Sequence, residues 1–454
     1  MRRRRIALLA TVTALLAPSV AHASLLPAPE PVTGAVEAPT ALADPTGVLA
    51  SPNVEVVAEV PNPGAIGARF RGQHMYVTTS TGLTIYDITD PAAPSEVGRL
   101  PLPHFENEDV DLGGDILLIS NDAAESTGIL YVIDISDPAA PAIRSTFPMG
   151  GDPVQGGPGH TASCVLDCSF AWVTDAAGVK VIDLRDPDHP VDLGTHETPA
   201  GGGIATHDVQ VDGDGHPWVV GFGGAAAYRL PKGYAGEGLG ELLLTTDQDG
   251  QSTYFAELGV GDGSKPNDYI LHNSLRRSGS DVLYVTEEDY TRPGCRGAGS
   301  FETWTVDTTG RKRLGAEQSH VLDTWQTELL ADTAQPAAVC SAHYFDERDG
   351  IVAQGWYQQG TRFLDVSDPT DIRQIGYFIP PAALTWAAYF APTDDTGRTV
   401  YALDAAYGIT VLRLTGPGAA DAPTVTAPVL AAWTEPIATA TPSSVFGTAC
   451  FLLR

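Results

Sequence analysis

Four histidines share a sequence context that is suited to metal chemistry. His160, His207, His272 and His343 each stand at the beginning of a short run with alternating apolar residues, in GPGHTASCV, IATHDVQV, YILHNSLR and CSAHYFDE. Neutral imidazole is a common ligand of Zn, Cu and Fe, and a set of histidines with one open side leaves room for water or a substrate. We therefore predict that these four residues hold a divalent transition metal, with Zn, Cu or Fe as the candidates.

Two carboxylates accompany the histidines. Asp208 directly follows His207, and Glu108 in FENEDVDL occupies the matching place in another part of the chain. Carboxylates near metal-bound histidines orient the ligands or act as a general base. Glu108 and Asp208 are therefore the catalytic candidates if the site belongs to an enzyme.

Two other interpretations of the same histidines stay open. Histidines at the start of a strand can bond neighbouring loops and serve only the structure, and histidines and glutamates can line a polar channel that binds an anionic or sugar-like ligand. The sequence does not decide between these and a metal site, nor does it decide whether the protein is an enzyme.

A repeat supplies the elements that must bring the histidines together. The stretch LTIYDITDPAAPSEVG, from Leu83, returns as LYVIDISDPAAPAIRS from Leu130, as VKVIDLRDPDHPVDLG from Val179 and as TRFLDVSDPTDIRQIG from Thr361. Each copy has an alternating run with β-branched residues, which is typical of a half-buried strand. The Asp-Pro pair that follows is turn chemistry, because Asp bonds its own backbone and Pro cannot donate to a strand ladder. Each copy therefore predicts a strand, a corner and a second strand.

The spacing of the repeat predicts the fold. The first three Asp-Pro corners are 47 and 49 residues apart. Units of about 40–50 residues with four short strands each are the signature of a β-propeller. Corners or weaker copies of them are found near Asp87, Asp134, Asp183, Ala225, Phe301, Asp365 and Gly408. We therefore expect an all-β, seven-bladed propeller.

The two ends of the repeat region predict how the ring closes. The last unit has sequence for three strands, whereas VEVVAEVP, from Val54, is a lone strand ahead of the first complete unit. The N-terminal strand is expected to complete the last blade and so remove an open edge. An open stack of units is the alternative, but it would need atypical capping units. Aligned on their corners, the units place the four histidines at the start of the innermost strands, which converge on one axis.

The repeated phrases LTIYDITDPAAP, LYVIDISDPAAP, VKVIDLRDPDHP and TRFLDVSDP resemble LVIVD repeats, over roughly residues 53–414. This resemblance implies a propeller of the kind found among exported and surface-associated proteins of bacteria and archaea. It implies no particular activity. We expect an extracellular or cell-surface binding module, with a metal-dependent extracellular oxidase or hydrolase as the alternative.

Composition and the N-terminus predict an exported protein. Arg2 to Arg5 precede an apolar run and an Ala-His-Ala site, which together are typical of a signal peptide at 1–23. An Ala/Pro-rich linker at 24–52, the propeller at 53–415 and an Ala/Pro/Thr-rich tail at 416–454 are expected to follow. The formal charge of −30 argues against nucleic acid as a partner. After signal cleavage we expect no integral membrane segment, and an extracellular ligand or surface component as the partner.

Five cysteines fit an oxidising compartment. Cys164 and Cys168 flank a short turn and could close one hairpin. Cys295 and Cys340 are a plausible longer pair, which leaves Cys450 near the C-terminus. The connectivity is not fixed by the sequence, and neither is the oligomeric state.

Overall fold

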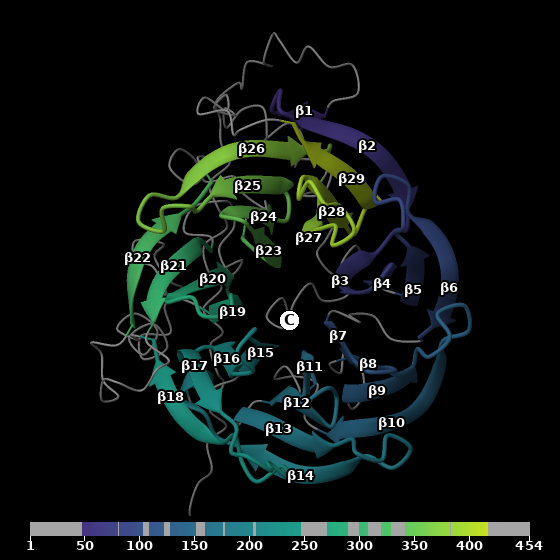
Figure 1. The fold of residues 1–454 in the computed structure, drawn as a ribbon, viewed down its shortest axis with the longest axis vertical. Coiled ribbons are helices and arrows are strands. Elements are labelled where there is room, and N and C mark those ends of the chain that lie inside the picture. The colour runs from purple at the N-terminus through teal and green to yellow at the C-terminus, as the bar shows by residue number, and fades with distance from the viewer. Residues whose placement is uncertain are drawn as a thin grey trace, which may run out of the picture. The chain divides into compact units, whose positions relative to one another are not determined.

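The computed structural model describes residues 48–79, 81–102, 109–121, 128–150, 159–175, 178–202, 206–246, 270–288, 299–306, 319–327, 341–381 and 383–415. The predicted signal peptide, most of the linker and the C-terminal tail lie outside these residues. The described strands belong to one compact unit, Ala38–Arg454. They form seven antiparallel sheets around a central axis, which confirms the seven-bladed β-propeller (Figure 1).

In the first six blades, four strands are arranged in chain order from the axis outward. The first three blades consist of β3 (Ala65–Arg71), β4 (His74–Thr79), β5 (Gly82–Asp87) and β6 (Ser95–Pro101); β7 (Val110–Gly113), β8 (Ile116–Asn121), β9 (Gly128–Asp134) and β10 (Ala142–Gly150); and β11 (Ala162–Val165), β12 (Phe170–Asp175), β13 (Gly178–Asp183) and β14 (Val191–His196).

The next three blades follow the same plan. They consist of β15 (Thr206–Val211), β16 (Pro217–Gly221), β17 (Gly224–Arg229) and β18 (Glu241–Thr245); β19 (Ile270–Arg276), β20 (Val282–Glu288), β21 (Phe301–Val306) and β22 (Ser319–Trp325); and β23 (Phe345–Arg348), β24 (Ile351–Gly355), β25 (Thr361–Asp365) and β26 (Arg373–Ile379). A short 3₁₀ turn, η1 (Pro199–Gly201), precedes β15.

Blade seven joins the two ends of the repeat region, as predicted. Its inner strands are β27 (Thr385–Phe390), β28 (Thr399–Asp404) and β29 (Gly408–Leu414), and its outer strand is β2 (Val54–Pro61). The pairing of β2 with β29 runs from Val54 opposite Leu414 to Pro61 opposite Gly408. A further short strand, β1 (Leu49–Ala50), pairs with β26 at the outside of blade six. The N-terminal strand therefore closes the ring.

The repeated Asp-Pro corners connect the third strand of a blade to its fourth. In the four clear copies, the Asp that ends the third strand accepts a hydrogen bond from the backbone N–H two residues further on, at 2.7–3.0 Å. These residues are Asp87, Asp134, Asp183 and Asp365. This local bond is the reason why the motif recurs, and it identifies the repeated Asp as part of the scaffold.

Two of the glycines that begin the repeated strands, Gly82 and Gly178, are required for steric reasons. Gly82 and Gly178 begin third strands with φ of 139° and 145°, in a region that L side chains rarely adopt. A Cβ at Gly82 would collide with the carbonyl oxygen of Leu100, and one at Gly178 with that of His196. Glycine therefore lets the third and fourth strands approach each other.

Neighbouring blades pack face to face through apolar side chains. Between blades one and two, for example, Tyr76 and Ile85 contact a cluster that includes Val110, Leu117 and Ile119, all of them buried. This packing holds the first strand of every blade against the axis, where β3, β7, β11, β15, β19, β23 and β27 form the innermost circle (Figure 1). No helix in the described part of the chain has the length and apolar character needed to cross a membrane.

Candidate metal centre

The four predicted histidines meet at one level of the axis. His207 lies in β15 and His272 in β19, whereas His160 and His343 each precede the first strand of their blade by two residues. All four histidines are buried, and at most 2% of the surface of each residue is exposed. Their rings form a row in chain order, with centroids 4.6, 4.1 and 4.0 Å apart. Blades three to six thus contribute one imidazole each.

β-Bulges aim two of these histidines at the axis. The pairing of β15 with β16 shifts between Thr206 and Asp208, which leaves His207 as the extra residue. The pairing of β19 with β20 shifts between Leu271 and Asn273, which leaves His272 as the extra residue. Bulges re-aim side chains and are frequent next to functional sites.

Glu288 is a fifth member of the cluster, and the repeat alignment did not find it. It ends β20, the second strand of blade five, and is fully buried. Its Oε2 lies 3.7 Å from Nε2 of His272 and 3.8 Å from Nε2 of His207, and its Oε1 lies 3.8 Å from Nε2 of His343. The available signal was a pair of glutamates at the end of the apolar run VLYVT, because alternation turns one of two neighbours inward.

Backbone carbonyls define the proton positions of two rings. Nδ1 of His207 lies 3.0 Å from the carbonyl oxygen of His272, and Nδ1 of His343 lies 2.9 Å from that of Trp386. A carbonyl oxygen only accepts, so each Nδ1 must carry the hydrogen. In the neutral rings, Nε2 then presents a lone pair, and in both residues Nε2 is the atom near Glu288.

The spacing of the donor atoms fits a single cation. Donor atoms of His207, His272 and Glu288 all lie within 4.8 Å of one another, and Nε2 of His160 lies 3.1 Å from Nε2 of His207. Ligands at about 2.0–2.2 Å from one ion lie between about 3 and 4.4 Å from each other. Tyr357 also orients the carboxylate, because its hydroxyl donates to Oε1 of Glu288 at 2.5 Å.

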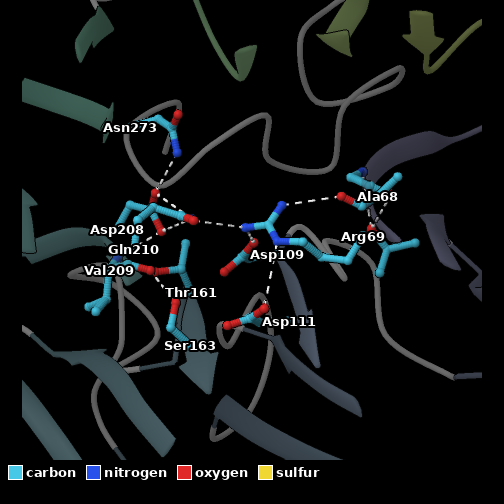
Figure 2. A network of polar contacts seen from close by, with 12 residues as sticks. Ala68, Arg69, Asp109, Asp111, Thr161, Ser163, Asp208, Val209, Gln210 and Asn273 are labelled. Carbon is cyan, nitrogen blue, oxygen red and sulfur yellow. Dashed lines mark hydrogen bonds and ion pairs between the residues drawn. The ribbon is translucent and has the colours of Figure 1, made fainter. Parts of the chain in front are cut away.

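The two predicted catalytic carboxylates have different outcomes. Glu108 lies outside the described residues. Asp208 follows His207 in the sequence and is buried. Its carboxylate does not face the histidines; it accepts hydrogen bonds from the side-chain amides of Asn273 at 2.6 Å and of Gln210 at 3.1 Å (Figure 2). Asp208 therefore belongs to a second polar layer of the axis.

Arg69 is the centre of that second layer. Its guanidinium lies 3.4 Å from Oδ1 of Asp109 and 3.7 Å from Oδ1 of Asp111, and it donates to the amide oxygen of Gln210 at 3.3 Å (Figure 2). Burial raises the pKa of Asp109 to about 8, against the opposing effect of Arg69. Burial likewise raises the pKa of Asp208 above its ordinary value. We call Arg69, Asp109, Asp111, Asp208, Gln210 and Asn273 the Arg69 network.

A second group of potential ligands, Asp212, Asp214 and His216, is already paired. Arg276 donates to Oδ2 of Asp212 at 2.6 Å and to Oδ2 of Asp214 at 2.9 Å. Asp212 also accepts the indole N–H of Trp218 at 2.9 Å. The Arg276–Asp212 ion pair in this group is buried, and together with Asp214 it fixes a hairpin turn.

The described cysteines, Cys164 and Cys168, lie at the two ends of the turn between β11 and β12. Their Cα atoms are 4.2 Å apart and their sulfur atoms are in contact. Cys295, Cys340 and Cys450 lie outside the described residues, so the second predicted pair stays a prediction.

Comparisons with known proteins agree with the repeat and the fold. The sequence model of the LVIVD repeat matches residues 70–100 and 123–147. No curated protein matches the chain. Among solved structures, the β-propeller domain of Myceliophteria thermophila Cps50 (Swd1) has a TM-score of 0.52 at 11% identity and covers 80% of this chain and 100% of its own. The RRP9 WD40 repeats have a TM-score of 0.50 at 11% identity, with 81% and 99% covered. At such identity these likenesses show the fold alone. The chain is therefore a seven-bladed β-propeller that carries LVIVD repeats.

Proposed function

We propose that this protein is a metal-binding propeller whose axis holds one divalent transition metal ion. His207, His272 and Glu288 are the central ligands, and His160 and His343 stand beside them. Imidazole together with one carboxylate suits Zn, Cu or Fe.

The observation that carries this proposal is the proton arrangement of His207 and His343. Their Nδ1 atoms donate to backbone carbonyls, so the neutral rings carry lone pairs on Nε2. The Nε2 atom of His343 faces Oε1 of Glu288, and that of His207 faces both Oε2 of Glu288 and Nε2 of His160. Lone pairs that face a buried carboxylate repel it, unless a cation lies among them. A metal ion with ligands in these positions removes that repulsion. A proton is the other candidate cation, and the experiment below distinguishes the two.

The burial of all five donors favours a binding or scaffold role for the metal. One ion held by His207, His272 and Glu288 would connect blades four and five, and His160 of blade three and His343 of blade six would lie beside it. We therefore propose a binding module whose ring the metal stiffens, and whose partner is an extracellular ligand or surface component. Export is proposed from the basic and apolar N-terminal segment, and a Cys164–Cys168 disulfide is consistent with an oxidising compartment.

Metal analysis of the purified protein tests the metal site. Inductively coupled plasma mass spectrometry should find about one equivalent of Zn, Cu or Fe. His207→Ala and Glu288→Gln should both lose it. His189→Ala is the matched control, because His189 is exposed and bonds only Asp186 among the described residues. Wild-type protein that takes up no metal after incubation with each of these ions would refute the site.

A metal-dependent oxidase or hydrolase is the second candidate, because a mixed set of histidine and carboxylate ligands is typical of catalytic sites. An enzyme needs an open coordination position. Azide added to the Co(II)-substituted protein should change its visible spectrum if such a position exists. An unchanged spectrum would favour the binding module.

A further inference from the structure

A small cavity with a mixed polar and apolar lining lies on the axis beside the Arg69 network. Its volume is about 180 Å³, and the inner strands of blades one, four, five, six and seven line it. Tyr344 forms part of its wall, and the ring of Tyr344 also contacts the rings of His272 and His343, with centroids 4.8 and 4.7 Å apart. The cavity is thus a separate space that adjoins the histidine cluster. Pockets for drug-sized ligands measure about 300–1,000 Å³, so this cavity fits a smaller molecule.

The polar groups at the cavity are held in fixed orientations. The side-chain amide of Asn273 donates a hydrogen bond to Asp208, and its amide oxygen points away from Asp208 (Figure 2). Gln210 donates to Asp208 and accepts from Arg69. A ligand would therefore find preorganised hydrogen-bonding groups, which lowers the entropic cost of binding.

The charges around the cavity disfavour an ionic ligand. The guanidinium of Arg69 lies among the carboxyl groups of Asp109, Asp111 and Asp208, so an anionic ligand would meet three carboxyl groups together with the one cation. Asp346, the carboxylate in the wall, already accepts from the guanidinium of Arg277 at 3.2 Å and from the backbone N–H of Phe390 at 3.2 Å. A cationic ligand would therefore have to compete with existing bonds.

Hydroxyl groups and aromatic rings complete the lining. Ser274 is buried, and its hydroxyl has no hydrogen-bond partner among the residues that the structure describes. Tyr389 contributes a second hydroxyl, and it packs against Phe70 with ring centroids 6.2 Å apart. Such a wall offers donors and acceptors at the edges of a ligand and apolar contact over its faces.

From this lining we infer that the axial cavity binds one neutral polyhydroxylated ring, such as a monosaccharide. Each sugar hydroxyl both donates and accepts, which matches the Ser274 and Tyr389 hydroxyls and the Asn273 amide oxygen. The C–H faces of the ring would lie against Phe70 and Tyr344. This inference does not depend on the proposed metal, because none of these contacts involves a metal ligand.

Calorimetric titration of the full-length protein with glucose, galactose and mannose tests the inference. At least one of these should bind saturably, and glucuronate and glucosamine should bind more weakly than the matching neutral sugar. Ser274→Ala and Tyr389→Phe each remove one hydroxyl and should weaken binding about threefold to tenfold. Tyr401→Phe is the matched control, because Tyr401 lies in the same blade and bonds the carbonyl oxygen of Pro91.

Three outcomes would overturn the inference: no saturation up to roughly 100 mM of any neutral sugar, stronger binding of a charged sugar, or equal affinity in the Ser274→Ala, Tyr389→Phe and control proteins. If a variant fails to fold, the comparison of neutral with charged sugars on wild-type protein still decides. His207→Ala protein treated with chelator should bind the sugar as wild type does. Failure of the metal proposal and failure of the sugar proposal can thus be distinguished.

Discussion

Nδ1 of His207 lies 3.0 Å from the carbonyl oxygen of His272, and this contact joins blade four to blade five. Similar contacts continue around the axis. The hydroxyl of Thr161 donates to the carbonyl oxygen of His207 at 2.7 Å, and Nδ1 of His343 bonds Trp386 of blade seven. The proposed ligands are therefore also inter-blade connectors, so metal binding and stability should be linked.

Removal of the metal should lower the melting temperature. A ligand at 100 times its dissociation constant stabilises the folded state by about 2.7 kcal/mol, and for a protein of this size such a loss corresponds to a fall of about 3–4 °C. Calorimetry before and after dialysis against a chelator measures the effect. His207→Ala protein should not respond to the chelator, whereas His189→Ala should respond as wild type does. A wild-type transition that the chelator leaves unchanged would count against the site.

Tyr357→Phe should weaken metal binding without abolishing it. The hydroxyl of Tyr357 orients Glu288 through a 2.5 Å hydrogen bond, and loss of a group that orients a ligand typically costs 10–100-fold in metal affinity. Competition with a chromophoric chelator measures the affinity. Glu288→Gln should lose binding altogether, and Tyr401→Phe should leave it unchanged. Equal affinities in all three variants would remove Glu288 from the ligand set.

Stability should depend on pH through Asp109. Burial raises the pKa of this residue from 3.8 to about 8, so between about pH 4 and pH 8 the folded state binds more protons than the unfolded state. The free energy of unfolding should therefore fall as the pH rises through this window, by at most about 1.4 kcal/mol per pH unit for one group. Urea unfolding across the window should show a shallower slope in Asp109→Asn. Asp115→Asn, in the next turn, is the control and should keep the wild-type slope.

Proline in β2 should open the ring at one of two adjacent positions. Ala58 lies opposite Val411 and Glu59 opposite Thr410, and in an antiparallel pair only alternate residues donate to the partner strand. Of Ala58→Pro and Glu59→Pro, one should therefore lower the free energy of unfolding by about 1–3 kcal/mol, and the other much less. Urea denaturation compares the two. If neither variant is destabilised, β2 does not close the ring in solution.

The fold was predictable because its signals are local. The Asp-Pro corner depends on a bond between an Asp side chain and the N–H two residues later, as at Asp87 and Thr89. Such a motif keeps its sequence in the four clear copies, and it sets the register of the blades. That register was sufficient to find His160, His207, His272 and His343.

The rest of the site depends on features that the register of the repeat does not capture. Glu288 comes from a second strand, and Tyr357 follows β24, so neither shares the repeat position of the histidines. The bulges at His207 and His272 turn successive residues toward the axis. A strict period of two cannot anticipate this, and for that reason Asp208 belongs to the Arg69 network rather than to the cluster.

The pairing of β2 with β29 also sets an order of events during synthesis. Blade seven combines Val54–Pro61 with strands that end at Leu414, so the first strand of the propeller waits for the last one to leave the ribosome. Until then, six blades form an open arc, and β2 is a solvated edge strand that another chain could capture. Closure of the ring therefore requires that both ends of the repeat region are available at the same time.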